Sequence, residues 1–550
     1  MPKVTIDNRT IDVAEGTTIL QAAATLGIAV PTLCHLKGFA PDPMCYVCVV
    51  QVEGRREMSP SCATVVVDGM SICTDSQDVL TARRTALELM LSDHTGDCVA
   101  PCSLACPAHL DNADFIYQMT RGDDRRALEI IKRKIALPAS LGRICPRFCE
   151  KACRRKDLDQ PVAICALRRF AADRDLESPE PYLPERAAAS GKRVAIVGAG
   201  PAGLSAAFYL QQFGHAATLI EARDEPGGLF RWALAEWRLP NRVLDGEIEV
   251  VRRLGAEIRT GTRLGSDVSL EELRRDFDAV LLATGAEIKG GAASYSEAGH
   301  AATGGEVDLA FVSGLGLAAG PRGIKADRAT QTTSQPGVFA AGNVVSGPNY
   351  GVQAIAAGRR AAVAIDQFVR GLAVTGEARH ANVVMRDLGD EEKARFHAGA
   401  DPAARVELGE EGSDKAQRGL DESEARTEAR RCLDCDCGKR RHCALREQSG
   451  AAGASLSRFR GDRRPLARDA SHAEIVYESG KCIQCGRCLR IAEAAREELG
   501  LTLIGRGFTV RTAVPLSGSL EAALRQTGRQ CAEACLTGAI SLKRALRQGR

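Results

Sequence analysis

The placement of the cysteines constrains what this chain can fold into more than any other feature. The chain has 21 cysteines, and residues 166 to 431 contain none. All but Cys73 fall in short groups, at 34–62, 98–106, 145–165, 432–443, 482–488 and 531–535. The first residues, MPKVTIDNRTIDV, lack a basic run followed by an apolar run, so we expect no secretory signal and a cytoplasmic protein. Thiols in a reducing compartment favour metal ligation over disulfides, so the groups predict metal or cluster sites.

Length and charge narrow the range of functions. A chain of 550 residues is too long for one ordinary core, so we expect several domains. The 73 basic and 70 acidic residues nearly cancel, which predicts no nucleic-acid partner and no anionic membrane surface as a target. The most apolar window, RVAIVGAGPAGLSAAFYL, is interrupted by glycines and Pro201. It therefore predicts a buried strand and turn, and we expect no membrane insertion.

The first cysteine group follows two short strand-like runs in residues 3–13 and a helical TILQAAATL segment. Its four cysteines have the spacing C-x10-C-x2-C-x13-C, and four thiolates are what a 2Fe-2S cluster requires. A structural zinc site is the alternative. The segment resembles a plant-type ferredoxin domain, and its spacing is similar to the large iron-sulfur subunit of bacterial complex I and its hydrogenase relatives. We predict that Cys73 is a buried apolar side chain and not a cluster ligand. The predicted cluster ligands are Cys34, Cys45, Cys48 and Cys62.

The next two groups, HTGDCVAPCSLACPAHLD and GRICPRFCEKACRRKDLDQPVAICALRRF, supply eight ligands, the number that two 4Fe-4S clusters need. They resemble the N-terminal iron-sulfur domain of the glutamate synthase small subunit family, shared with dihydropyrimidine dehydrogenase. The resemblance implies one cluster on Cys106, Cys145, Cys149 and Cys165. It leaves Cys98, Cys102, Cys153 and His94 for the second cluster. A histidine four residues before a cysteine is also a cluster ligand in the complex I subunit, which favours His94 as a ligand. The alternative is that His94 is a solvated or capping residue at the end of the LELMLSDH helix.

The cysteine-free middle carries a strand, KRVAIV, that runs into G-x-G-x-x-G and an alanine-rich helix, the pattern of a pyrophosphate-binding turn. An acidic residue ends the next strand, where a ribose hydroxyl is bound. The run GGLFRWALAEWRLPNRVLDGEI and the distal TSQPGVFAAGNVVSGPNYGVQAIAAGRRAA resemble the same glutamate synthase family and imply FAD. A NAD-type Rossmann domain is the alternative, but the distal segment has no role there. The predicted FAD-binding residues are Gly198, Gly200, Pro201, Ala202, Gly203, Glu221, Gly228, Arg238, Gly342 and Asn343.

The interval between the two FAD segments is short. In the resembled family it holds a complete second Rossmann domain for NADPH, which needs well over ~100 residues because each βαβ piece takes ~30. Here it runs only from Ala286 to Gln335, and no strand in it leads into G-x-G-x-x-G. We therefore predict that the nicotinamide-binding domain is missing.

The C-terminal region contains two further cysteine motifs. RCLDCDCGKRRHCALR offers a four-cysteine site for either a 4Fe-4S cluster or zinc, with the ligands Cys432, Cys435, Cys437 and Cys443. GKCIQCGRC has the C-x2-C-x2-C spacing of a ferredoxin-type 4Fe-4S cluster, whose fourth ligand comes from CAEACLTGAI. Cys535 before TGAI resembles the ferredoxin ending, and Cys531 is the alternative. The predicted ligands are Cys482, Cys485, Cys488 and Cys535.

These features predict a multidomain α+β and α/β protein. The predicted parts are a β-grasp 2Fe-2S ferredoxin domain (1–92), a helical domain with two 4Fe-4S clusters (93–188), a Rossmann-type FAD domain lacking the NADPH-binding domain (189–375), a charged linker (376–428) and a cysteine-rich ferredoxin-like domain (429–550). The predicted cofactors are FAD, one 2Fe-2S cluster, three 4Fe-4S clusters and the further four-cysteine site.

We find no general acid, nucleophile or substrate pocket in the sequence, so we predict no catalytic residue. The chain is interpreted as an electron-transfer subunit of a soluble multi-subunit oxidoreductase. By resemblance its partners include an NADH-oxidising FMN subunit and a formate dehydrogenase, hydrogenase or other low-potential reductase. One alternative is a self-sufficient NAD(P)H-dependent oxidoreductase like the glutamate synthase small subunit. Another is an architectural subunit with degenerate cofactor sites.

Overall fold

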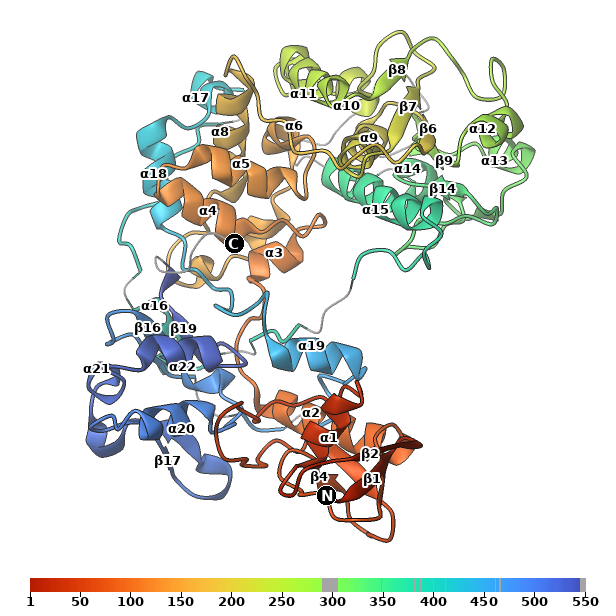
Figure 1. Ribbon diagram of the computed structural model, residues 1–550. Helices are drawn as coiled ribbons and strands as arrows, with labels where there is room; N and C mark the ends of the chain where they lie inside the picture. The colour runs from red at the N-terminus through yellow and green to blue at the C-terminus, as the bar shows by residue number, and fades with distance from the viewer. Residues whose placement is uncertain are drawn as a thin grey trace. The chain divides into compact units, whose positions relative to one another are not determined.

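The computed structural model describes residues 1–288, 305–347, 349–378, 382–385, 388–398, 400–410, 412–459, 461–463 and 466–544. The chain forms two compact units (Figure 1). Unit 1 comprises Met1–Val99, Arg379–Ala398 and Asp436–Arg550. Unit 2 comprises Ala100–Ala378 and Gly399–Cys435. Each unit is therefore assembled from separate segments of the chain, and its sites draw on residues far apart in sequence.

The N-terminal part of unit 1 is a mixed five-stranded sheet in the order β2-β1-β5-β3-β4. β1 pairs antiparallel with β2 and parallel with β5. Helix α1 starts with a capping box in which Thr18 accepts from the backbone of Gln21 and the Gln21 side chain accepts in return. The predicted strands and helix are present. Their bounds are β1 Lys3–Ile6, β2 Arg9–Asp12, α1 Ile19–Thr25, β3 Val49–Val52, β4 Ser59–Pro60, β5 Met70–Cys73 and α2 Gln77–Asp93.

The C-terminal part of unit 1 is built on a three-stranded antiparallel sheet, β15-β16-β19, with a separate β17–β18 ladder. Its core gathers Ile475, Ile491, Leu520, Leu524 and Ile540. The elements are α16 Asp390–His397, α19 Ala444–Ala451, β15 Arg468–Asp469, β16 Ile475–Glu478, η2 Ser479–Lys481, α20 Arg487–Ala494, β17 Thr502–Ile504, η3 Gly507–Thr509, β18 Arg511–Ala513, η4 Pro515–Ser517, α21 Leu520–Ala523, α22 Gly528–Ala534 and β19 Ile540–Leu542.

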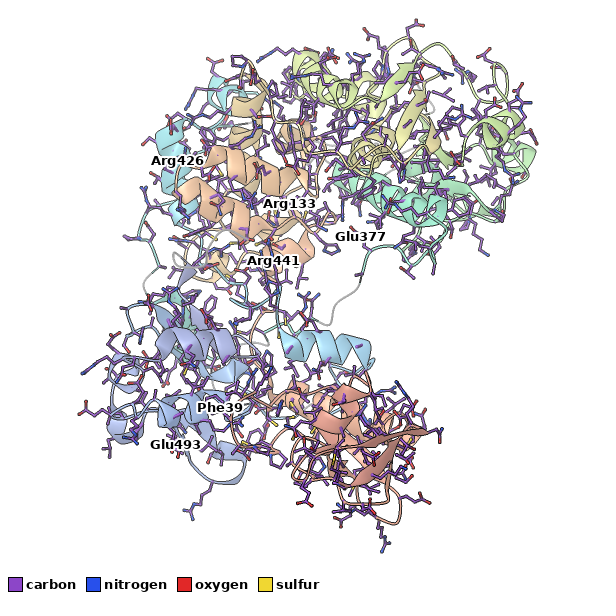
Figure 2. All side chains as sticks on the ribbon, in the orientation of Figure 1. Phe39, Arg133, Glu377, Arg426, Arg441 and Glu493 are labelled. Carbon is purple, nitrogen blue, oxygen red and sulfur yellow. The ribbon has the colours of Figure 1, made fainter. Side chains whose placement is uncertain are left out.

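Unit 2 begins with a helical part. Its helices are α3 Pro101–Ala105, α4 Asn112–Thr120, α5 Asp124–Lys132, α6 Pro138–Ile144, α7 Phe148–Lys151, η1 Arg154–Asp157, α8 Ile164–Leu176, α17 Asp414–Arg418 and α18 Glu422–Arg430. α18 packs on α4 and α8. Arg426, labelled in Figure 2, pairs with Asp124 at 2.8 Å and donates to the carbonyl of Met119 at 3.0 Å.

The charge of the predicted linker suggests a solvated face, but the end of the linker is buried. Glu428 is fully buried, and its carboxylate accepts from the backbone of Ala163 at 2.7 Å and of Val406 at 2.8 Å. The buried Arg431 pairs with Glu428 at 2.8 Å. The charge run looked solvated in the sequence because the partners that neutralise it lie elsewhere in unit 2.

The rest of unit 2 is a Rossmann-like domain, as predicted. Five strands pair in parallel in the order β14-β9-β6-β7-β8. Helices α9 and α15 pack closely on each other, since an ideal Cβ on Gly358 would lie 2.1 Å from the carbonyl oxygen of Ala202. The elements are β6 Arg193–Val197, α9 Pro201–Gln212, β7 Ala216–Ile220, α10 Leu229–Trp232, α11 Asn241–Arg253, β8 Glu257–Arg259, α12 Leu270–Asp276, β9 Ala279–Leu282, β14 Val338–Ala340, α14 Asn343–Ser346 and α15 Gly351–Val369. Among the described residues, no helix is long and apolar enough to cross a membrane.

One buried carboxylate ties the helical part of unit 2 to the Rossmann-like domain. Glu247 on α11 accepts from the backbone of Ala139 at 2.6 Å and of Ser140 at 3.0 Å, and from the Ser140 hydroxyl at 2.5 Å. Burial raises the pKa of Glu247 to about 7 despite these donors. The folded state therefore binds the proton more tightly than the unfolded chain does.

We predict that the free energy of unfolding falls as pH rises from about 4.5, the ordinary pKa of the carboxyl, to about 7. The expected loss from this group is on the order of 3 kcal/mol, since one pKa unit is ~1.4 kcal/mol. Denaturant unfolding followed by circular dichroism from pH 4.5 to 8 measures it. The Glu247→Gln variant should show a flatter profile over this range. A profile as steep as that of the unsubstituted protein would contradict the assignment.

Candidate iron-sulfur and flavin sites

The four cysteines predicted for the 2Fe-2S cluster converge in unit 1. Cys34, Cys45, Cys48 and Cys62 are all buried, and the backbone N–H of Cys34 donates to the Cys45 sulfur at 3.5 Å. Hydrogen bonds from the Cys45 and Cys62 thiols lower the pKa of Cys34 to about 2. A hydrogen bond from Cys62 lowers the pKa of Cys48 to about 6. Four sulfurs linked in this way form the compact donor set that a 2Fe-2S cluster requires.

A second set of neighbouring cysteines lies in the helical part of unit 2 and contains Cys106, Cys145, Cys149 and Cys165. The Cys165 thiol is hydrogen-bonded to Cys145 and to Cys149. Cys106 lies close enough to Cys145 for their charges to interact. Cys165 is on α8, Cys145 follows α6, and Cys149 is on α7. Three short helices therefore bring these sulfurs together.

The four cysteines predicted for the ferredoxin-like motif also lie together. Cys482, Cys485, Cys488 and Cys535 line one pocket together with Tyr477 and Thr512. The Cys535 sulfur accepts from the backbone of Ile540 at 3.3 Å, and the Cys482 sulfur accepts from Gln484 at 3.4 Å. Backbone N–H groups that donate to sulfur are typical of iron-sulfur ligands.

Cys531, the alternative fourth ligand of this motif, is fully buried and belongs to the apolar core of the C-terminal part of unit 1. Its thiol donates to the carbonyl of Cys488 at 3.7 Å. Cys531 does not line the pocket that holds the other four cysteines. These observations favour a structural thiol at Cys531 and support Cys535 as the ligand.

A fourth site combines residues that the sequence assigned to different groups. His94, Cys98, Cys437 and Cys443 line one pocket in unit 1. His94 directly follows α2, and Cys443 directly precedes α19. The Cys98 sulfur accepts from the backbone of Val383 at 3.4 Å, and the Cys437 thiol donates to the carbonyl of Thr537 at 3.4 Å. Burial raises the pKa of the Cys98, Cys437 and Cys443 thiols, which would be deprotonated on binding a metal.

This grouping differs from the predicted one. The sequence placed His94 and Cys98 with Cys102 and Cys153, which belong to unit 2. It also kept Cys432, Cys435, Cys437 and Cys443 together, but the first two belong to unit 2 and the last two to unit 1. No local spacing signals the new set, because its two pairs are separated by more than 300 residues of chain.

The remaining cysteines of unit 2 are Cys102 on α3, Cys153 before η1, and Cys432 and Cys435 after α18. Cys102, Cys153 and Cys432 are half-buried and pack against the same apolar core. The segments that carry Cys153 and Cys432 are tied together, since Arg155 donates to the carbonyl of Arg431 at 2.7 Å. Burial raises the pKa of Cys153, and the charge of Arg431 opposes this shift.

The glycine fingerprint lies where β6 turns into α9. Gly198 has a φ angle of 106°. An ideal Cβ on Gly198 would lie 2.4 Å from the carbonyl oxygen of Ala283, the residue that follows β9. A Cβ on Gly203 would lie 2.0 Å from the carbonyl oxygen of Gly198. Pro201 is the first residue of α9, and Ala202 is buried beneath the turn. The N-terminus of a helix after such a turn favours a pyrophosphate.

Glu221 and Gly228, two further predicted FAD residues, lie beside this turn. Glu221 follows β7, and its carboxylate accepts from the backbone of Ala199 at 2.8 Å and of Arg223 at 3.0 Å. Gly228 comes so near the fingerprint that its Cβ would lie 2.7 Å from the Cα of Gly200. Arg238 lies half-buried in the loop after α10.

The distal segment reaches the same turn. A Cβ on Gly342 would lie 3.0 Å from the Cβ of Ala202. The next residue, Asn343, begins α14, and its buried amide oxygen has no hydrogen-bond partner within the described part of the chain. A buried acceptor without a donor fits a ligand hydroxyl such as those of the ribityl chain of FAD. The residues present therefore fit the flavin.

The shortened interval forms small antiparallel ladders. β10 (Glu287–Ile288) pairs with β11 (Gly305–Glu306), and β12 (Ala319–Gly320) pairs with β13 (Gly323–Ile324). Helix α13 (Leu309–Gly314) lies between them in the chain. Within the described residues of this interval, no strand leads into a glycine turn and helix. Residues 289–304, which include Gly290, Gly291 and Gly304, lie outside the described residues.

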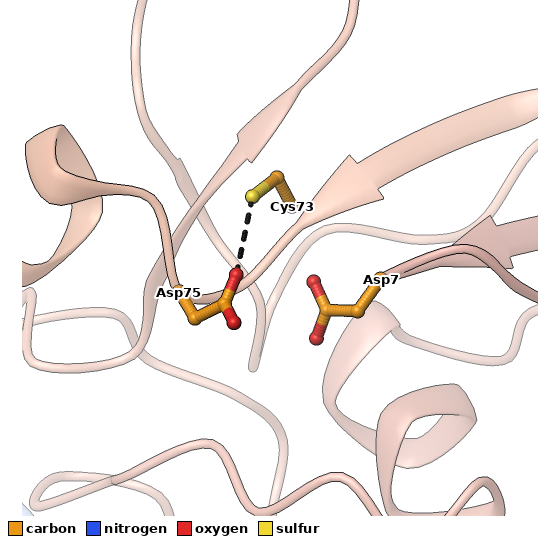
Figure 3. A group of neighbouring side chains, drawn as sticks. All are labelled: Asp7, Cys73 and Asp75. Carbon is orange, nitrogen blue, oxygen red and sulfur yellow. Dashed lines mark hydrogen bonds between the residues drawn. The ribbon is translucent and has the colours of Figure 1, made fainter.

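Cys73, expected to be a buried apolar residue, is only half-buried and lies beside two aspartates, as Figure 3 shows. Its thiol donates to Asp75 at 3.5 Å. Asp7 accepts from the backbone N–H of Thr74 at 2.7 Å and from its hydroxyl at 2.5 Å. These bonds link the β1–β2 turn to the residues after β5, so the group has a structural role.

Comparisons with known proteins agree with the domain content. The 2Fe-2S iron-sulfur cluster binding domain family matches residues 2–77, and dihydropyrimidine dehydrogenase domain II, 4Fe-4S cluster, matches residues 88–179. The pyridine nucleotide-disulphide oxidoreductase family matches residues 172–361. The chain thus contains 2Fe-2S, 4Fe-4S and FAD/NAD-type oxidoreductase domains, and the resemblance inferred for these parts is confirmed. The ferredoxin-like character of residues 429–550 stays a prediction.

Several curated relatives match about a third of the chain. The NADP(+)-dependent formate dehydrogenase subunit beta of Moorella thermoacetica is 41% identical over 207 residues, which are 34% of this chain and 29% of that protein. The NADPH-Fe(3+) oxidoreductase subunit beta of Geobacter sulfurreducens is 40% identical over 190 residues, 34% and 28% of the two chains. The glutamate synthase [NADPH] small chain of Mycobacterium tuberculosis is 37% identical over 193 residues, 34% and 39% of the two chains. The match spans less than a third of the first two relatives.

Proposed function

We propose that the chain is an iron-sulfur flavoprotein subunit that relays electrons between partner subunits of a multi-subunit oxidoreductase. The relatives named above are a formate dehydrogenase subunit, an iron oxidoreductase subunit and a glutamate synthase small chain. By analogy, the partners are an NADH-oxidising FMN subunit and a formate dehydrogenase, hydrogenase or other low-potential reductase. Substrate chemistry then belongs to those partners, and this chain holds cofactors.

The observation that carries this proposal is the meeting of three cysteine sites in one apolar cluster of unit 1. The cluster includes Cys34 and Cys45 of the first site and Cys443 of the His94 site, and Cys485 of the ferredoxin-like site packs against it. Thr537 lines the pockets of the last two sites. Arg490 on α20 donates to the carbonyl of Cys34 at 2.6 Å. Electron tunnelling requires closely spaced centres, and a shared apolar cluster keeps these three sites close to one another.

We propose five four-ligand sets in place of the predicted grouping. The first holds the 2Fe-2S cluster, and each of the others holds a 4Fe-4S cluster. When bound, such clusters accept and donate single electrons, and FAD exchanges one or two. The sets are Cys34, Cys45, Cys48 and Cys62; Cys106, Cys145, Cys149 and Cys165; Cys482, Cys485, Cys488 and Cys535; His94, Cys98, Cys437 and Cys443; and Cys102, Cys153, Cys432 and Cys435. Zinc is the alternative metal for the last two sets, which metal analysis distinguishes.

The test of the function is an anaerobic absorbance titration of the isolated chain. Because the nicotinamide domain is missing by our proposal, we expect dithionite to bleach the flavin and cluster bands while NADPH and NADH leave them unchanged. The addition of an NADH-oxidising partner should restore bleaching. Rapid bleaching by either nucleotide alone would instead support the self-sufficient oxidoreductase. An empty flavin site with zinc in place of iron would support the architectural subunit.

A further inference from the structure

Arg168 is a buried cation beside the Cys106, Cys145, Cys149 and Cys165 set. It lies on α8, one helical turn after Cys165, and only 1% of it is exposed. Its guanidinium donates to the carbonyl of Leu141 at 2.8 Å and to the Cys165 sulfur at 3.6 Å. Burial lowers the pKa of Arg168, but the charges of the four cysteines of this set outweigh burial and raise it.

No carboxylate pairs with Arg168 in the described part of the chain. The neighbouring arginines differ: Arg143 pairs with Asp173 at 2.7 Å, and Arg169 pairs with the same carboxylate at 3.1 Å. Glu150, the acidic residue beside Cys149, forms an ion pair with Arg405 at 2.8 Å. A buried charge without a counter-ion is strongly unfavourable, so the thiolates are the partner that makes Arg168 tolerable.

The charge of this partner depends on its redox state. Four thiolates around a 4Fe-4S core carry a net negative charge, which grows by one when the core is reduced. A fixed positive charge nearby stabilises the more negative, reduced state, and it does so strongly where water is excluded. Net charge and hydrogen bonds to sulfur are two of the factors that set the reduction potential of such clusters.

We propose that Arg168 is the internal counter-cation of the Cys106, Cys145, Cys149 and Cys165 site, and that it raises the reduction potential of the cluster held there. The inference rests on the proposed ligation of a 4Fe-4S cluster by these cysteines. Arg168 touches a ligand sulfur, so its role is to position and tune the site. The positive charge of Arg168 makes this cluster easier to reduce than one without a buried cation. Electrons that enter unit 2 would therefore preferentially reduce this cluster.

The experiment is an anaerobic redox titration of the full chain followed by electron paramagnetic resonance. The signal of this cluster is identified as the one that Cys165→Ser changes. In Arg168→Gln we expect its midpoint potential to become more negative, with at least about a tenfold fall in the reduction equilibrium constant, which is about 59 mV for a one-electron couple. Arg168→Lys keeps the charge and should stay near the original potential.

Arg169→Gln is the matched control, because it removes a charge from the next position on the same helix, where Asp173 already neutralises it. The midpoint potential of the cluster should be unchanged in this variant. An unshifted midpoint in a fully loaded Arg168→Gln variant would overturn the proposal, and so would loss of the cluster in both Arg168 variants. Loss of iron in Arg168→Gln but not in Arg168→Lys would support a required counter-charge. If the unsubstituted chain lacks iron at this site, the proposed ligation itself fails, which iron analysis reveals separately.

Discussion

Replacement of Cys437 by alanine is expected to abolish the same paramagnetic signal as replacement of Cys98, although the two residues lie far apart along the chain. Both sulfurs line the pocket that also contains His94 and Cys443. A 4Fe-4S cluster that loses one of its ligands is commonly lost or converted, so each variant should lose up to four irons relative to the unsubstituted chain. Iron analysis and low-temperature electron paramagnetic resonance of the reduced protein measure the effect.

Two further variants, Cys531→Ala and Cys432→Ala, test which cysteines share a site. Cys531→Ala removes a thiol that is equally buried in unit 1 but lies outside the pockets, so its iron content should equal that of the unsubstituted chain. Cys432→Ala should abolish a different signal, because Cys432 belongs to unit 2. If Cys432→Ala and Cys437→Ala abolish one and the same signal, the four-cysteine grouping predicted from the sequence is right and ours is wrong.

The second large effect concerns the flavin. Gly203→Val should reduce bound FAD to less than about a tenth of one per chain, because a Cβ at this position would lie 2.0 Å from the carbonyl oxygen of Gly198. The side chain would force α9 away from the fingerprint turn and displace the backbone groups that favour the pyrophosphate. The flavin released by denaturation, measured by fluorescence, gives the stoichiometry.

Gly246→Ala is the control for this variant. Gly246 lies inside α11 of the same unit, and an added Cβ would meet only the Leu176 side chain at an ordinary 3.5 Å. Alanine also has a higher helix propensity than glycine, so the substitution should leave FAD at its original level. Iron content should be unchanged in both variants. Full FAD occupancy in Gly203→Val would show that this turn does not hold the flavin.

Much of the candidate chemistry follows from contiguous motifs. Cys482, Cys485 and Cys488 lie within seven residues, so this short segment brings their sulfurs together whatever the rest of the chain does. The fingerprint from Gly198 to Gly203 specifies its own turn, and the parallel sheet around it follows from alternating strands and helices. Because their motifs are contiguous in the chain, the 2Fe-2S and flavin-type domains can be predicted from the amino-acid sequence alone.

The sequence by itself determined the candidate ligand types and the local turns, because both depend on neighbours in the chain. Only the tertiary structure decided which half-motifs line a common pocket, since His94 and Cys98 meet Cys437 and Cys443 across the whole intervening unit 2 segment. It also decided that Glu428 is buried and that Arg168 donates to the Cys165 sulfur while Arg169, one residue later, pairs with Asp173. The physical reason is that burial and charge pairing arise from packing between distant segments, and spacing along the chain carries no record of them.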